Sequence, residues 1–184
     1  MVLYFNFKLQ SMKHANQASL YVSIYLWAIL IGAIVYSHIV FYPVYVLHLP
    51  ESTALLDGAY PMDDSGFWTV IIPVLLLAML VTVMLNWRYA SKRKYILIAL
   101  AFYAVALVAT ATYFVPELKA FSKSVGSGIS KSNWQQRGSQ WLYLSWVRCV
   151  FMLIGFYMLL RGLRVSRHDD KKRSNRQPNT ATTK

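Results

Sequence analysis

The chain has 184 residues, of which 57% are hydrophobic and only 14% are charged, and its formal net charge is +12. A water-soluble domain of this length carries about a quarter charged residues, so the composition argues against one and predicts an integral membrane protein. The single cysteine, Cys149, excludes an internal disulfide and does not indicate a redox compartment.

Four apolar segments account for the shortage of charge. Each reaches or exceeds the roughly 20 residues that a helix needs to cross a bilayer. We therefore expect an all-α, integral membrane four-helix bundle over residues 18–163, with spans at 18–47, 67–87, 95–116 and 141–163. A cytoplasmic or interfacial segment (1–17) precedes it, and a basic, disordered tail (164–184) follows. The first span is too long for a cleavable signal peptide, and no small-residue cleavage site ends it.

Lysine and arginine are distributed unevenly over the segments that flank the spans. The N-terminal segment has two, the second connection (88–94) four and the tail from Arg161 eight, whereas the first connection (48–66) has none and the third (117–140) four. The positive-inside rule therefore predicts a multi-pass protein of the cell membrane with both termini in the cytoplasm. The tail has no aromatic residues between its charges, so we expect attraction to anionic lipid and no nucleic-acid partner.

The connections on the predicted outer side carry further signals. Pro43 and Pro116 stand at the outer ends of the first and third spans, where each is expected to break or kink its helix. The first connection predicts a short interfacial helix after Pro50 and a helix cap at Asp63-Asp64-Ser65. The third connection (117–140) is long for a link between helices, which favours a lid.

Two ionisable residues, His38 and Arg148, lie inside the apolar spans. His38 is five residues before Pro43, and Arg148 is seven residues after Trp141. At the helical rise per residue, His38 lies about 7–15 Å and Arg148 about 10 Å below the same outer surface. An arginine at that depth is costly unless it faces protein, water or a partner, so the matching depths indicate a shared site.

Polar side chains at helical spacing extend from these two residues toward the outer surface. Three stripes result: His38, Tyr42 and Tyr45; Thr110, Tyr113 and Glu117; Trp141, Ser145 and Arg148. Their convergence predicts an outward-facing polar cavity in which Glu117 pairs with Arg148. Purely structural readings stay open, in which Arg148 extends to the surface, His38 is hydrogen-bonded to a neighbouring helix and the tyrosines are interfacial anchors.

The sequence identifies no metal ligands. His48 lies ten residues after His38, which puts the two on different helical faces, and a second histidine within a span for axial haem ligation is missing. Phosphate-binding loops, nucleophile elbows and paired-carboxylate motifs are also lacking. The cofactor, if the protein uses one, is therefore unassigned.

The first, third and fourth spans together resemble the anthrone-oxygenase-like four-helix membrane proteins. The resemblance rests on Gly32 and the Leu-Pro-Glu-Ser turn, on Val115-Pro116, and on Trp141, Ser145 and Arg148 in QWLYLSWVRCVFML. Ser145 stands where the family pattern has a histidine, and Glu117 replaces an asparagine usual after the third-span proline. The resemblance covers roughly residues 20–163 and implies a small membrane protein, some relatives of which oxidise polycyclic phenols with oxygen.

These observations lead to one functional hypothesis and its rivals. We expect the cavity to bind a small amphipathic or aromatic molecule such as a phenol, a quinone or a lipid, with an oxygenase-like oxidation as the enzymatic version. Arg148 would stabilise an anionic oxygen, His38 would act as general base, and Tyr42 and Tyr113 would donate hydrogen bonds. The remaining expected ligand contacts are Glu117, Trp141, Ser145 and Thr110. The main rival is a non-catalytic subunit or assembly factor of a larger membrane complex, or a homo-oligomer; a transporter is disfavoured because no inverted repeat is visible.

Overall fold

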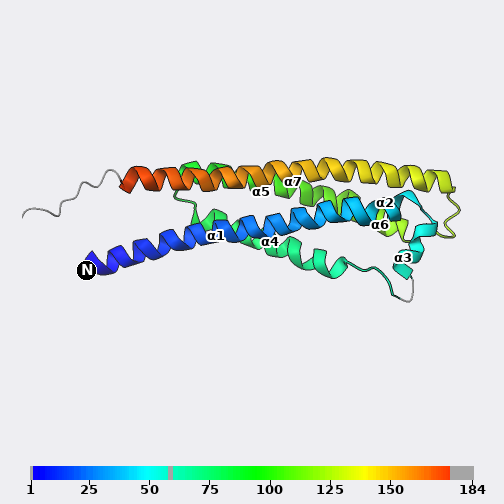
Figure 1. The fold of residues 1–184 in the computed structure, drawn as a ribbon, viewed down its shortest axis with the longest axis horizontal. Helices are drawn as coiled ribbons and strands as arrows, with labels where there is room; N and C mark the ends of the chain where they lie inside the picture. The colour runs from blue at the N-terminus through cyan, green and yellow to red at the C-terminus, as the bar shows by residue number, and fades with distance from the viewer. Residues whose placement is uncertain (1, 58–59, 175–184) are drawn as a thin grey trace, which may run out of the picture.

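The structure is a computed structural model that describes residues 2–57 and 60–174, with side chains from 14 to 56 and from 60 to 165. Within these residues it is all-α, and four stretches are long and apolar enough to cross a membrane: His14–Leu47, Ser65–Leu85, Ala90–Phe121 and Lys131–Val165. This confirms the predicted helical membrane bundle. Figure 1 shows the long helices running side by side along one axis.

Two of the four spans are interrupted by a turn of wider helix. The first consists of α1 (Val2–Tyr36), the π-helical turn η1 (Ser37–Phe41) and α2 (Tyr42–Leu47). The third consists of α5 (Ala90–Ala109), the π-helical turn η3 (Thr110–Phe114) and α6 (Val115–Phe121). The second span is α4 (Ser65–Leu85), and the fourth is α7 (Lys131–Ser174), so this helix continues through residues 164–174, where the sequence predicted disorder. Residues 175–184 of the predicted tail lie outside the described residues.

The π-helical turns explain how the chain accommodates its two outer prolines. Proline lacks an N–H and its ring collides with the preceding helical turn, so an uninterrupted α-helix is unfavourable there. In the structure the Tyr42 N–H bonds the Ser37 carbonyl and the Val115 N–H bonds the Thr110 carbonyl, each five residues back. Pro43 and Pro116 then stand in the first turn of a new α-helix, where the missing N–H costs least.

The connections between the first and second spans and between the third and fourth spans are more ordered than a lid would be. A 3-10 turn, η2 (Glu51–Thr53), and the short α3 (Ala54–Asp57) confirm the helix expected after Pro50. The Asp63 carboxylate accepts the Ser65 N–H at 2.9 Å just before α4, while Asp64, the N-cap residue, makes no side-chain cap hydrogen bond. The predicted long third connection is wrong, because α6 and α7 extend into it and leave only residues 122–130 between them. There Gly126 and Gly128 take positive φ of 71° and 75°, which glycine adopts without strain.

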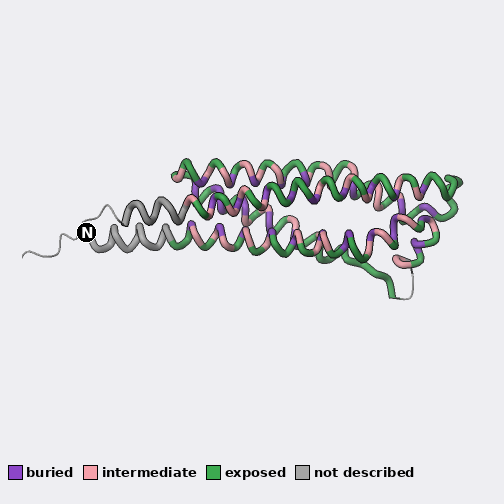
Figure 2. Tube along the Cα trace, turned by 45° about the horizontal axis from the view of Figure 1, so that its top comes forward, coloured by how far each residue is buried: buried purple, intermediate pink, exposed green. Residues whose placement is uncertain are grey.

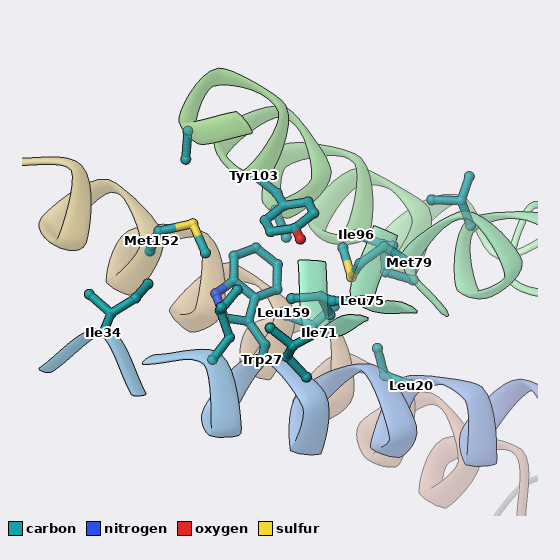
Figure 3. Close-up of a cluster of buried hydrophobic side chains, with 14 of the residues drawn as sticks. Leu20, Trp27, Ile34, Ile71, Leu75, Met79, Ile96, Tyr103, Met152 and Leu159 are labelled. Carbon is teal, nitrogen blue, oxygen red and sulfur yellow. The ribbon is translucent and has the colours of Figure 1, made fainter. Parts of the chain in front are cut away.

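Buried side chains form two clusters that divide the bundle along its length. Figure 2 shows the buried residues on the inner faces of the helices and the exposed ones on the outside, as expected for helices that face lipid. One cluster centres on Trp27 and is drawn in Figure 3; it includes Leu75, Tyr103, Met152 and Leu159. The second cluster is rich in aromatic rings and occupies the end of the bundle near α2 and α6.

Close helix contacts are made at small residues, as is usual in membranes. A Cβ atom added to Gly155 would lie 2.8 Å from the Trp27 ring, and one added to Gly138 would collide with the Val46 carbonyl. Near the C-terminal end of α4, the Thr82 hydroxyl lies 2.9 Å from the Ser23 hydroxyl and links α4 to α1.

Candidate ligand-binding cavity

Arg148, on α7, is the charged residue at the centre of the candidate site. One terminal nitrogen, Nη1, donates to the Thr110 hydroxyl at 2.8 Å, and the other, Nη2, donates to the Ser145 hydroxyl at 3.0 Å. The guanidinium carbon lies 4.1 Å from the centre of the Phe114 ring, a cation–π contact. The third nitrogen, Nε, is buried without a hydrogen-bond partner. Arg148 is therefore held in place by neutral groups.

His38, in η1, is connected to Arg148 through Ser145. Its Nδ1 lies 2.6 Å from the Ile34 carbonyl, which can only accept, so Nδ1 carries the proton. Its Nε2 lies 2.7 Å from the Ser145 hydroxyl. Because the Ser145 oxygen already accepts from Arg148, its own hydrogen is free to point at Nε2. The geometry therefore fits a neutral imidazole with Nε2 as the acceptor.

The resulting network has one direction. Donation starts at Arg148, passes through the Ser145 hydroxyl and the His38 ring, and ends at the Ile34 carbonyl. A second branch passes through the Thr110 hydroxyl to the Ala106 carbonyl at 2.7 Å. Each branch passes through a π-helical turn, since His38 belongs to η1 and Thr110 to η3. Such turns recur at functional sites because they redirect side chains that a regular helix would place elsewhere.

Aromatic rings surround this network on the side of α2 and α6. The Tyr42 ring centre lies 4.7 Å from that of Trp141 and 5.3 Å from that of His38, both in edge-to-face geometry. The Trp141 indole N–H donates to the Phe114 carbonyl at 3.1 Å, which ties α7 to η3. Trp141 is 1% exposed, so it is a core residue.

A cavity of about 690 Å³ lies next to Arg148. This volume is within the range of small-molecule sites, and most of the lining is apolar, as in such sites. Residues from all four spans and from the first outer connection contribute. The lining includes Leu30, Ile34, His38, Tyr42, Tyr45, Asp63, Asp64, Ser65, Ile72, Tyr103, Ala106, Thr110, Phe114, Lys119, Trp141, Arg148 and Met152.

The structure brings together six of the eight residues predicted for the site. His38, Tyr42, Thr110, Trp141 and Arg148 line the cavity, and Ser145, which is fully buried, connects His38 with Arg148. Tyr113 and Glu117 are not among the lining residues. Their positions on the turn that follows Thr110 suggested a continuous stripe, but the π-helical turn η3 changes the helical phase at that point.

The predicted pairing of Glu117 with Arg148 is wrong. Glu117 accepts hydrogen bonds from Arg137 at 2.8, 2.9 and 3.2 Å, in a bidentate ion pair near the outer end of α7. Arg137 also covers the Trp134 ring at 4.4 Å from its centre. The side chains of Arg137 and Glu117 are both partly exposed, and an ion pair forms there at a lower desolvation cost than at a buried position. Arg148 consequently has no ion pair among the described residues.

Sequence reasoning missed Phe114, whose ring covers the guanidinium of Arg148. The available signal was its position four residues after Thr110, on the same helical face. The carbonyl of Ile34, which orients His38, carries no sequence signal at all, because any residue there would supply it.

The described side chains of His, Cys, Asp and Glu form no group of three that could hold a metal ion. Comparisons of the chain with protein-family models, with curated proteins and with solved structures found no match. The resemblance to anthrone-oxygenase-like proteins thus rests on the short sequence motifs alone, and the function has to be argued from the cavity.

Proposed function

We propose that this multi-pass membrane protein binds a small amphipathic molecule whose anionic or strongly accepting oxygen is placed at Arg148. The proposal rests on one observation: the wall of a mostly apolar cavity contains a cationic side chain that is paired with no carboxylate among the described residues. An unpaired charge in such surroundings is costly, and intramembrane ionisable residues usually mark a functional site. A ligand oxygen at this position would supply the missing counter-charge.

The neighbouring groups favour binding of an anion over a structural role for Arg148. Thr110 and Ser145 fix both terminal nitrogens without neutralising them, which keeps the guanidinium orientated and charged. The rings of Tyr42, Phe114 and Trp141 provide flat apolar surfaces beside the guanidinium for the part of the ligand that bears the anionic group. A phenolate, an enolate or a carboxylate on an apolar frame matches both features.

Binding can be tested with three probes that share one ring system. We expect purified protein in lipid nanodiscs to bind 1-naphthoate more tightly than 1-naphthol, and both more tightly than naphthalene. A charge-assisted hydrogen bond contributes about 1.5–3 kcal/mol, so Arg148→Met should weaken naphthoate binding about ten- to hundredfold and leave naphthalene unchanged. Arg164→Met, an exposed position on the same helix, is the matched control. Equal affinity for naphthoate in wild type and Arg148→Met would refute the proposal.

An enzymatic use of the same cavity is favoured by one further observation, the acceptor state of His38 Nε2. To take the proton of a bound phenol, the substrate class that the family resemblance implies, Nε2 would exchange its hydrogen bond from Ser145 for one from the phenol, since His38 lines the cavity. The measurement is oxygen consumption with anthrone and 1-naphthol as substrates. Turnover that is lost in a folded His38→Ala variant supports catalysis by His38. Absence of turnover in wild type leaves binding as the function, and turnover that survives in His38→Ala shows that the histidine has no catalytic role. Co-purification of a stoichiometric protein partner would instead favour the subunit hypothesis.

We also propose that both termini face the cytoplasm, on the basis of the lysine and arginine distribution. In a Cys149→Ser background, Ser122→Cys and Ser91→Cys place single exposed thiols at opposite ends of the bundle. A membrane-impermeant maleimide should label intact cells at residue 122 only. Labelling at residue 91 alone would show the opposite orientation, with both termini outside the cell.

A further inference from the structure

The cavity extends on both sides of Arg148 along the bundle axis. The network fixes a common level at which His38, Thr110 and Ser145 meet. On the side away from the outer connections, Leu30 lies eight residues from His38 and Tyr103 lies seven residues from Thr110, and both line the cavity. At the helical rise per residue, the cavity continues for about 10–12 Å beyond the level of the guanidinium.

This deeper part, which we call the lower chamber, is apolar. Its walls are formed by Leu30, Ile34, Ile72, Tyr103, Ala106 and Met152. The Tyr103 hydroxyl is occupied, because it donates to the Ile72 carbonyl at 2.8 Å. Tyr103 therefore presents its ring to the chamber, and none of these side chains offers a free polar group.

The floor of the lower chamber is closed by the Trp27 cluster. Trp27 is fully buried, and its ring centre lies 5.4 Å from that of Tyr103. In Figure 3 the Trp27 ring lies next to Tyr103, with Ile34 and Met152 to one side and Leu75 and Leu159 to the other. Gly155 packs closely against the Trp27 ring, and neither residue is among those that line the cavity. The chamber therefore ends at a defined depth.

The charges at the opposite end of the cavity bear on the orientation of a ligand. Asp63 and Asp64 line the mouth, together with one lysine, Lys119. The pKa of Asp63 is lowered by its hydrogen bonds to Ser65, so this carboxyl is ionised at neutral pH. An amphiphile with its anionic group at the mouth would face these carboxylates and leave hydrocarbon beside Arg148. Both contacts are unfavourable, so the anionic group belongs at Arg148.

We propose that the ligand binds with its anionic group at Arg148 and an unbranched or narrow apolar chain in the lower chamber, which limits the length of that chain. The ligand class is a single-chain carboxylate or a similarly shaped anion, and not a phospholipid whose head group stays at the surface. This inference rests on the proposed binding of an anion at Arg148.

The test is a series of straight-chain carboxylates, from butanoate to tetradecanoate, titrated against the protein in nanodiscs. Each methylene that enters the chamber should raise affinity about fourfold, from the transfer free energy of about 0.8 kcal/mol per buried CH₂. Partition of each carboxylate into protein-free nanodiscs is measured separately and subtracted. Once the chamber is full, the remaining affinity for the protein should stop rising with chain length. The chain length at this plateau is the quantity that the variants are expected to change.

Ala106→Leu fills part of the chamber and should shift the plateau to shorter chains. Ile34→Ala enlarges the chamber and should shift it to longer chains. Both variants keep the backbone carbonyls that anchor Thr110 and His38. Ala104→Leu, an exposed position on the same helix, is the matched control and should not move the plateau.

The outcomes separate this inference from the proposed function. If carboxylates of every length bind Arg148→Met as tightly as wild type, the proposed function fails. If they require Arg148 but their plateau is unchanged in both Ala106→Leu and Ile34→Ala, the anion site stands and the lower chamber is not where the chain lies. A plateau that moves in opposite directions in the two variants supports the inference.

Discussion

Ser145 is the residue on which the polar network depends, and Ser145→Ala is the sharpest test of it. The substitution keeps the backbone and the Cβ atom but removes the hydrogen bonds to His38, at 2.7 Å, and from Arg148, at 3.0 Å. His38 is 2% exposed and Ser145 is fully buried, so water cannot replace the lost hydroxyl without a rearrangement. The variant thus leaves a buried acceptor, His38 Nε2, without its donor.

The expected magnitude lies between two limits. A buried polar group that loses its partner costs about 1–3 kcal/mol in soluble proteins. Hydrogen bonds between membrane helices contribute less, about 0.6 kcal/mol on average and about 1.7 at most, because the unfolded chain in a membrane also finds partners. Since Ser145→Ala removes two bonds, we expect the free energy of unfolding to fall by about 1–2 kcal/mol.

The assay is reversible unfolding in mixed micelles of increasing SDS fraction, followed by far-UV circular dichroism. Ser139→Ala is the matched control, because Ser139 lies exposed on the same helix and donates only to the Gln135 carbonyl, at 2.9 Å. Its effect should stay within about 0.5 kcal/mol. If Ser145→Ala falls within that same range, the network contributes no measurable stability, and the reasoning from its geometry is refuted.

Two further predictions concern packing and the outer connections. Gly155→Ala should lower the free energy of unfolding by about 1–3 kcal/mol, because the added methyl would lie 2.8 Å from the Trp27 ring. Gly32→Ala is the control and should not lower it, because the added methyl meets nothing within 4 Å. Equal effects of the two substitutions would contradict the packing argument. The hydrogen bond from Lys131, at 2.7 Å, holds the pKa of Glu51 below its usual range. A lowered folded-state pKa means that the ion pair contributes fully above the ordinary carboxyl pKa and is lost as pH falls through the lowered value. On acidification, backbone hydrogen exchange in residues 51–57 should therefore become faster relative to the intrinsic exchange rate at each pH. This acceleration should be smaller in Lys131→Met, which lacks the ion pair. An equal response in wild type and variant would show that the ion pair does not order this segment.

The sequence by itself determined the class of the protein and the elements that cross the membrane. Apolar runs of sufficient length have one stable solution in a bilayer, a helix that satisfies its own backbone hydrogen bonds, so composition and length were enough. The matching depths of His38 and Arg148 followed from the helical rise per residue and the positions of Pro43 and Trp141. These inferences use local geometry, which a sequence carries directly.

Only the tertiary structure decided which polar groups are partners. Glu117 and Arg148 have opposite charges at compatible depths, yet Glu117 pairs with Arg137, because the π-helical turn η3 rotates the helix beyond Thr110. The same kind of turn places His38 within hydrogen-bonding distance of Ser145. Helical phase after a π-turn depends on how the helix packs against its neighbours, and residue spacing assumes a regular helix. The cavity and its unpaired arginine are likewise products of packing among four spans, which no single segment specifies.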